Sequence, residues 1–121
     1  PDALLFAPGE MPKKMRKHLD LIQEALNSQQ VIRIAYQDAE GKASQRELWP
    51  LGLFFWGKVW TLTAWCELRQ DFRNFRVDRM EGIKRAKRRF TPVPGKRLED
   101  YLALVAAECG APLPPGLPKF D

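Results

Sequence analysis

The sequence predicts a mainly β domain with one α-helix at each end. Between residues 30 and 90, short runs of apolar and β-branched side chains alternate with tight turns, as expected for a series of short strands. On either side of this region, apolar residues recur at spacings of three and four, which is the periodicity of an amphipathic helix. Several short strands within about 60 residues favour a small, strongly bent sheet or a barrel.

The first helix is expected from Pro12 to Ser28 and leads into the main body of the domain. Proline suits the first turn of a helix, where its missing N–H would have no partner in any case. The apolar residues that follow the helical spacing are Met15, Leu19, Ile22, Ala25 and Leu26.

The β region is divided by turn residues and one proline. Gly41 can adopt a positive φ in the turn at residues 38–42, and Gly57 and Lys58 suit a tight turn. Pro50 has no N–H to donate to a strand ladder, so we expect it to break or bend the sheet. The predicted strands are residues 31–36, 44–49, 51–56, 59–65 and 75–78, and residues 67–74 are predicted to form a polar loop.

A second helix is expected after a linker at residues 91–95. Its apolar residues are Leu98, Tyr101, Leu102, Val105 and Ala106. Gly110 suits the C-cap of this helix. Residues 112–121 contain four prolines and are expected to form a poorly ordered tail. The predicted segments are therefore 1–29, 30–91 and 92–121.

Positive charge is concentrated in one segment. The chain has 20 Lys and Arg against 15 Asp and Glu, a net charge of +5. Residues 69–89 hold nine basic and three acidic residues, which leaves 11 basic and 12 acidic residues in the remainder. Such a concentration suits a polyanion such as nucleic acid, a nucleotide or an anionic membrane surface, but also a solvated face that keeps the protein in solution.

Arginines and aromatic residues alternate in the basic segment and just before it. The arginines are Arg69, Arg73, Arg76 and Arg79, and the aromatic residues are Trp60, Trp65, Phe72 and Phe75. Guanidinium groups bind phosphate in a bidentate manner, and exposed rings stack on unpaired bases, so the pattern suits single-stranded nucleic acid. Alternatively, the rings belong to the core and the arginines pair with neighbouring carboxylates.

No catalytic or metal site is expected. The sequence has no glycine-rich phosphate loop, and His18, the only histidine, is expected to be an ordinary residue on the surface of a helix. Cys66 and Cys109 with one histidine are too few for a four-ligand zinc site. No stretch approaches the ~20 apolar residues of a membrane-spanning helix. We therefore expect no enzyme activity and no cofactor.

The sequence resembles the WYL domain of bacterial winged-helix transcription regulators of the DeoR type. The matching residues are Ile34–Tyr36, Gly41, Arg46, Pro50–Leu53, Gly57, Trp60, Leu62, Arg69, Arg73, Phe75, Arg76, Asp78, Arg79 and Phe90. The resemblance extends over about half of the chain, and several matches in the right order make it specific. Thr61 is a departure, because it stands at the tyrosine that gives the family its middle letter.

The resemblance implies an Sm-like, SH3-type β-barrel and an effector-sensing role. Such a domain usually follows a winged helix-turn-helix domain and binds single-stranded nucleic acid or a nucleotide-like effector. The chain begins at Pro1 and holds no helix-turn-helix of its own, which suits a fragment of a longer regulator with residues 1–29 as the connector. An attached DNA-binding domain and a cytoplasmic location without membrane association follow from this, and a homodimer is left open.

The resemblance also implies an anion site, whose arginines are Arg46, Arg69, Arg73 and Arg76. Tyr36 and Trp60 are expected as its aromatic floor, although both positions also suit packing in the core. Arg79 either joins the site or pairs with neighbouring carboxylates. The alternative function is a dimerisation or interaction module without a ligand of its own.

Overall fold

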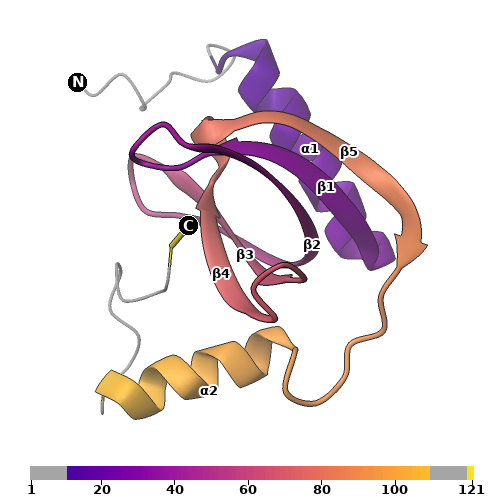
Figure 1. Ribbon diagram of the computed structural model, residues 1–121, viewed down its shortest axis with the longest axis vertical. Helices are drawn as coiled ribbons and strands as arrows, with labels where there is room; N and C mark the ends of the chain where they lie inside the picture. The colour runs from indigo at the N-terminus through magenta and orange to yellow at the C-terminus, as the bar shows by residue number, and fades with distance from the viewer. Residues whose placement is uncertain (1–10, 110–119) are drawn as a thin grey trace.

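The computed structural model describes residues 11–109 and 120–121 (Figure 1). Its elements are α1 (Lys13–Ser28), β1 (Gln30–Gln37), β2 (Ala43–Phe55), β3 (Trp60–Cys66), β4 (Asp71–Arg76), the 3₁₀ turn η1 (Val77–Arg79), β5 (Met80–Arg89) and α2 (Leu98–Cys109). The strands form one antiparallel sheet in the order β4-β3-β2-β1-β5. The predicted mainly β class with a helix at each end is confirmed.

The sheet curls strongly but is open (Figure 1). β4 and β5 are its two edge strands, and the three residues of η1 connect one edge to the other. The barrel that the family resemblance implied is therefore a curled sheet whose two edges do not share a hydrogen-bonded ladder.

Both predicted glycine turns are present. Gly41 has φ +82° in the β1–β2 turn, where a carboxylate oxygen of Asp38 accepts the backbone N–H groups of Glu40 and Lys42. Gly57 has φ +89° in the β2–β3 turn, which is closed by a hydrogen bond from the Trp56 N–H to the Val59 carbonyl. These backbone angles favour glycine because it has no Cβ.

Pro50 bends the sheet without interrupting the strand. The two strands predicted on either side of it form the single strand β2, and the register with β3 shifts between Pro50 and Gly52. Such a bulge inserts an extra residue into one strand and increases its local twist. The long, bent β2 lets one strand pair with both β1 and β3 in a curled sheet.

The polar loop predicted at residues 67–74 is wrong in its second half. β4 begins at Asp71, and it ends at Arg76, two residues before the end of the predicted strand at 75–78. The alternation of apolar and polar residues is hidden because both faces of β4 are covered. Phe72 and Asn74 are buried on one face of β4, and Phe75 is buried on the other face.

The main core lies between α1 and the inner face of the sheet. Ile22 and Ala25 of α1 are fully buried there. They pack with residues of several strands, among them Ile32, Ile34, Leu48, Leu62, Phe75 and Met80.

His18, expected on the helix surface, is half-buried and its Nε2 donates to the Met80 carbonyl at 3.1 Å. Burial lowers the pKa of His18 more than this hydrogen bond raises it.

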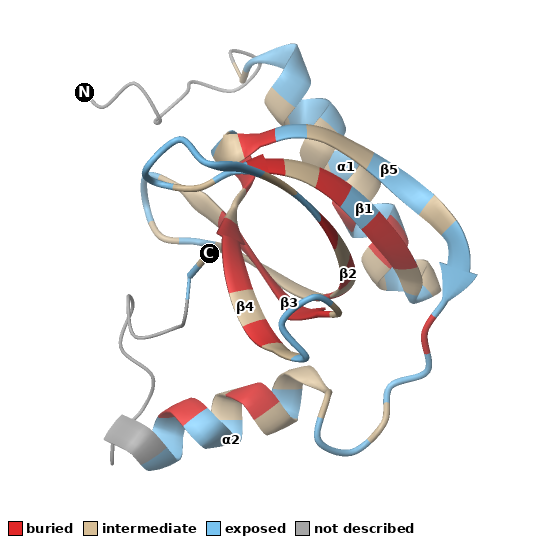
Figure 2. Ribbon diagram, in the orientation of Figure 1, coloured by how far each residue is buried: buried red, intermediate tan, exposed pale blue. Residues whose placement is uncertain are grey.

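A second, smaller core joins α2 to the outer face of β3 and β4 (Figure 2). Its buried members are Trp65, Phe72, Tyr101 and Val105. The Lys96 ammonium group lies 5.2 Å and 5.0 Å from the ring centroids of Trp49 and Trp65, a cation–π arrangement at the start of α2. Gly110, the predicted cap of this helix, lies outside the described residues.

Neither helix in the described part of the chain is long and apolar enough to span a membrane.

A glycine at position 29 should stabilise the fold. Gln29 ends α1 with φ 53° and ψ 49°, a left-handed conformation that costs a residue with a Cβ about 1 kcal/mol. We expect Gln29→Gly to raise the free energy of unfolding by about 1 kcal/mol in urea titrations. Gln70→Gly is the comparison, because Gln70 has φ 51° but its side chain also donates to the Glu67 carbonyl at 2.8 Å. The free energy of unfolding should rise less in Gln70→Gly than in Gln29→Gly. A loss of stability in Gln29→Gly would contradict the prediction.

Candidate anion-binding site

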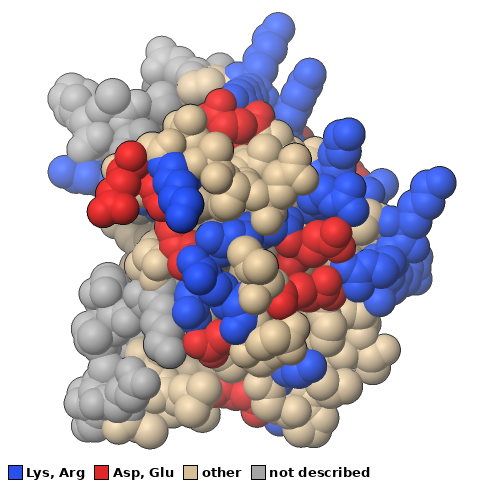
Figure 3. Space-filling model, viewed as in Figure 1, with Lys and Arg blue, Asp and Glu red and all other residues tan. Residues whose placement is uncertain are grey.

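Three of the predicted arginines converge on one carboxylate, that of Asp121. Arg46 comes from β2, Arg69 from the turn between β3 and β4, and Arg73 from β4. The Arg46 guanidinium donates to the carboxylate, Arg69 Nε lies 3.2 Å from Oδ2, and Arg73 Nε lies 3.6 Å from Oδ1. Figure 3 shows basic side chains gathered on the face where the C-terminal end of the chain meets β4.

Arg46 points into the main core because of its place in the strand. It lies opposite Ile34, two residues before the buried Leu48, so it shares the inward face of β2. Only 7% of Arg46 is exposed, and its guanidinium lies 5.9 Å from the centroid of the Phe75 ring. Nη1 also lies 3.7 Å from the Cys66 sulfur. Within the described chain, the buried Nε has no hydrogen-bond partner.

The backbone of Asp121 is held as firmly as its side chain. Its N–H donates to the Asn74 carbonyl at 3.1 Å, and its carbonyl accepts the Tyr36 hydroxyl at 3.0 Å. Phe120 forms a parallel bridge with Asn74 on the edge strand β4. The tail was expected to be poorly ordered; residues 112–119 lie outside the described residues, but Phe120 and Asp121 have defined positions because β4 and the arginines bind them.

Tyr36 contributes its hydroxyl to the site, while its ring belongs to the core. The ring is 1% exposed and packs edge-on against Phe75, with centroids 5.1 Å apart. The hydroxyl accepts the Arg76 N–H at 3.0 Å and donates to Asp121. Burial raises the pKa of Tyr36, and although the Arg76 N–H and the Arg79 side chain oppose this shift, the phenol remains a hydrogen-bond donor.

Asp121 and Arg46 stabilise each other's charged forms. Burial alone would raise the pKa of the Asp121 carboxyl, but hydrogen bonds from Arg46 and Arg69 outweigh it and hold the pKa below its usual range. Burial likewise opposes the charge of Arg46, and the bonds to Asp121 and Cys66 still raise its pKa. Both partners are therefore ionised at neutral pH.

Arg76, Arg79 and Trp60 lie apart from this carboxylate. Arg76 forms a two-point ion pair with Asp78, at 3.0 Å and 2.7 Å, and the pair raises its pKa. Because side chains alternate along a strand, Arg73 and Arg76 leave β4 on opposite faces. Arg79 neighbours the Tyr36 hydroxyl. Trp60 packs against the main core and the exposed Phe55, with ring centroids 5.0 Å apart.

Thr61, at the family's tyrosine position, is buried. Its hydroxyl accepts the indole N–H of Trp56 at 2.8 Å. The position thus makes a hydrogen bond within the β2–β3 hairpin.

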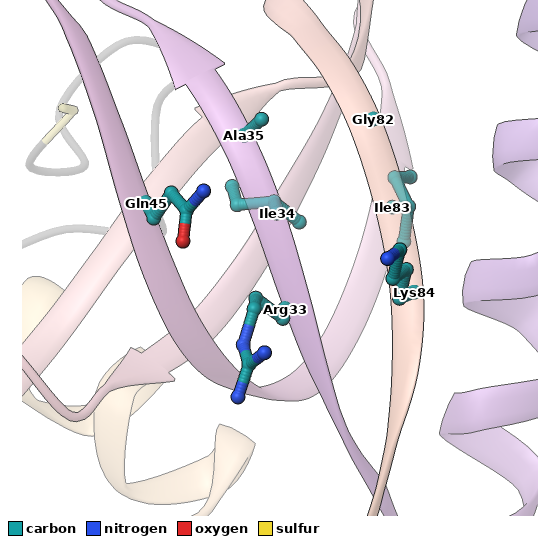
Figure 4. Close-up of a pocket in the computed structure, with 7 residues that line it drawn as sticks. All are labelled: Arg33, Ile34, Ala35, Gln45, Gly82, Ile83 and Lys84. Carbon is teal, nitrogen blue, oxygen red and sulfur yellow. The ribbon is translucent and has the colours of Figure 1, made fainter.

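The basic residues of β5 lie apart from the Asp121 carboxylate. Arg88 pairs with both Glu47 and Glu67, which lowers the pKa of each carboxyl, and Arg33 pairs with Glu47 at 3.0 Å. A shallow pocket crosses β1 between Gln45 and Lys84 (Figure 4). None of its lining residues belongs to the predicted anion site. In the described part of the chain, no group of three metal-ligating side chains is present.

Comparison with known proteins identifies the family. The WYL domain model matches residues 17–85, more than half of the chain. The chain belongs to the WYL domain family. As a WYL domain it is a regulatory domain of the kind found in transcription regulators.

A solved structure shares the fold. It is proteasome accessory factor B/C (PafBC) of Arthrobacter aurescens, with a TM-score of 0.64 and 22% sequence identity. The match covers 91% of this chain and 15% of that chain, so this WYL domain corresponds to a small part of the larger protein.

The contact between Asp121 and the arginines predicts a pH-dependent stability. Because the Asp121 pKa is lowered on folding, the contact should stabilise the protein above pH ~4 and be lost as pH falls through the lowered value. We expect NMR titration of the Asp121 carboxyl carbon to give a midpoint below ~3.9. Arg46→Met keeps the apolar stem and should raise this midpoint. A midpoint at or above the ordinary value in the unmodified protein would show that the contact is not formed.

Proposed function

We propose that this WYL domain senses an effector in a transcription regulator, and that the effector is single-stranded nucleic acid or a nucleotide-like anion. The observation that supports this most directly is the convergence of Arg46, Arg69 and Arg73 on one carboxylate. Carboxylate and phosphate oxygens accept guanidinium hydrogen bonds with similar geometry. A site that holds the one is therefore suited to hold the other.

The three arginines form a path from solvent to the interior. The side chain of Arg69 is 46% exposed, that of Arg73 is 19% exposed and that of Arg46 is 7% exposed. An incoming phosphate would meet the exposed Arg69 first and the buried Arg46 last. Because Arg46 is packed on Phe75, its guanidinium is already oriented, and little entropy would be lost on binding.

The remaining predicted residues fit secondary roles. The buried Tyr36 ring is unsuited to stacking on a base, so we assign its hydroxyl to an oxygen of the ligand. Trp60 and the exposed Phe55 form the aromatic pair that is available at the β2–β3 hairpin. Arg76 and Arg79 flank the Tyr36 hydroxyl, so we propose that they position it.

A route from the site to an attached DNA-binding domain passes through η1. The Tyr36 hydroxyl accepts the N–H of Arg76, the residue before η1, and the carbonyl of Met80, the residue after it, accepts His18 of α1. A ligand that changes the Tyr36 contact would act on both ends of this turn. It can switch the regulator only by favouring one arrangement of α1, which we propose as the connector, over another.

The binding function is tested by fluorescence anisotropy with a labelled oligothymidylate and the matching duplex over a range of salt. We expect preference for the single strand, and more than about tenfold weaker binding by Arg69→Ala/Arg73→Ala. The slope of log affinity against log salt should fall by about 0.7, because the two arginines act on one phosphate and each neutralised phosphate on a single strand contributes about 0.7.

The matched control is Arg33→Ala/Arg85→Ala, which removes the same charge from exposed arginines that each have a carboxylate partner. Equal losses in both double variants would make the binding a property of net charge. If the unmodified protein binds neither oligonucleotide, the dimerisation module becomes the better account, and the mass of the protein in solution tests it.

A further inference from the structure

We propose that Asp121 is a built-in occupant of the arginine site, which an anionic effector must displace before it can bind. The inference rests on the function proposed for that site. It adds that the chain lowers its own affinity for the effector, because the Asp121 carboxylate occupies the position in which a phosphate would bind.

The contacts of Asp121 are those of a bound ligand rather than of a surface residue. Its carboxylate receives Arg46 and Arg69 on Oδ2 and has Arg73 near Oδ1, and only 11% of the side chain is exposed. Its backbone adds one hydrogen bond to Tyr36 and one to Asn74. Displacing a carboxylate with this many partners requires an anion that satisfies the same donors.

The preceding residue uses the open edge of the sheet. β4 is an edge strand, and Phe120 lies against it in a parallel bridge at Asn74. Edge strands accept extended segments because their outward backbone groups are not paired within the sheet. The edge therefore sets the register that delivers the carboxylate to the arginines.

The charge of the buried Arg46 explains why another anion has to replace Asp121 when it leaves. If Asp121 left without replacement, the buried Arg46 would lose the carboxylate that balances its charge, and an unpaired buried charge is strongly unfavourable. Asp71 already pairs with Arg73 at 2.6 Å, so the three arginines exceed the two carboxylates by one charge. A phosphodiester of a single strand carries one negative charge, as the Asp121 carboxylate does, so it can replace Asp121 without leaving Arg46 unpaired.

Occupation by Asp121 lowers the apparent affinity for an effector. The effector binds only the fraction of molecules in which the site is accessible, so its apparent dissociation constant rises as that fraction falls. Displacement also releases residues 120–121 from β4. Effector binding and exposure of this edge are then one event, which gives the domain a structural change to report.

The test compares Asp121→Asn with the unmodified protein for binding of a labelled oligothymidylate. Asparagine keeps the shape of the side chain but removes the charge that holds the arginines, and we expect about tenfold tighter binding. Asp20→Asn removes the same charge from an exposed position on α1 and should change the affinity no more than about twofold. Equal effects of the two variants would overturn the inference and leave the binding function intact.

A second measurement needs no variant and so is independent of any effect on folding. In the unmodified protein the Asp121 N–H is bonded to Asn74, and its hydrogen exchange should become faster when the oligonucleotide saturates the site. Unchanged protection at saturation would overturn the inference. If the oligonucleotide binds neither the unmodified protein nor Asp121→Asn, the proposed function fails and the inference fails with it.

Discussion

The structure around the site depends on one constraint, which is that a charged guanidinium is buried in an apolar core. Arg46 lies beside Phe75 and Cys66, where an isolated charge would be strongly unfavourable. The fold therefore needs an anion inside the curled sheet. The Asp121 carboxylate, which accepts the Arg46 guanidinium, meets this need.

The second core determines which arginines can reach this interior. α2 covers the outer face of β3 and β4 and fixes β4 through Asn74, whose amide donates to the Tyr101 hydroxyl at 2.8 Å. With that face occupied, Arg73 is directed inward beside Arg46, and Arg76 is left to pair with Asp78. The smaller core thus helps to position Arg73, although it contains none of the arginines.

Local patterns predicted most of the fold, and the family pattern predicted that three of the arginines lie together. Helical spacing located both helices, and glycine located the hairpin turns, because these signals depend on near neighbours in the chain. The grouping of Arg46, Arg69 and Arg73 followed from the family pattern. By contrast, β4 was partly missed because both of its faces are buried. The position of Asp121 could not be predicted, since its arginine partners are 48 to 75 residues away and no local pattern marks it.

The gap between β4 and β5 affects what holds the curvature of the sheet. A closed barrel can change its diameter only if strand pairs shear or separate, because its ladder is continuous. Here the ladder is interrupted between β4 and β5, and only the short η1 turn crosses the gap. The curvature can therefore relax without breaking a ladder hydrogen bond. The curvature is instead held by packing across the interior, where the ring of Tyr36 on β1 lies edge-on against Phe75 on β4.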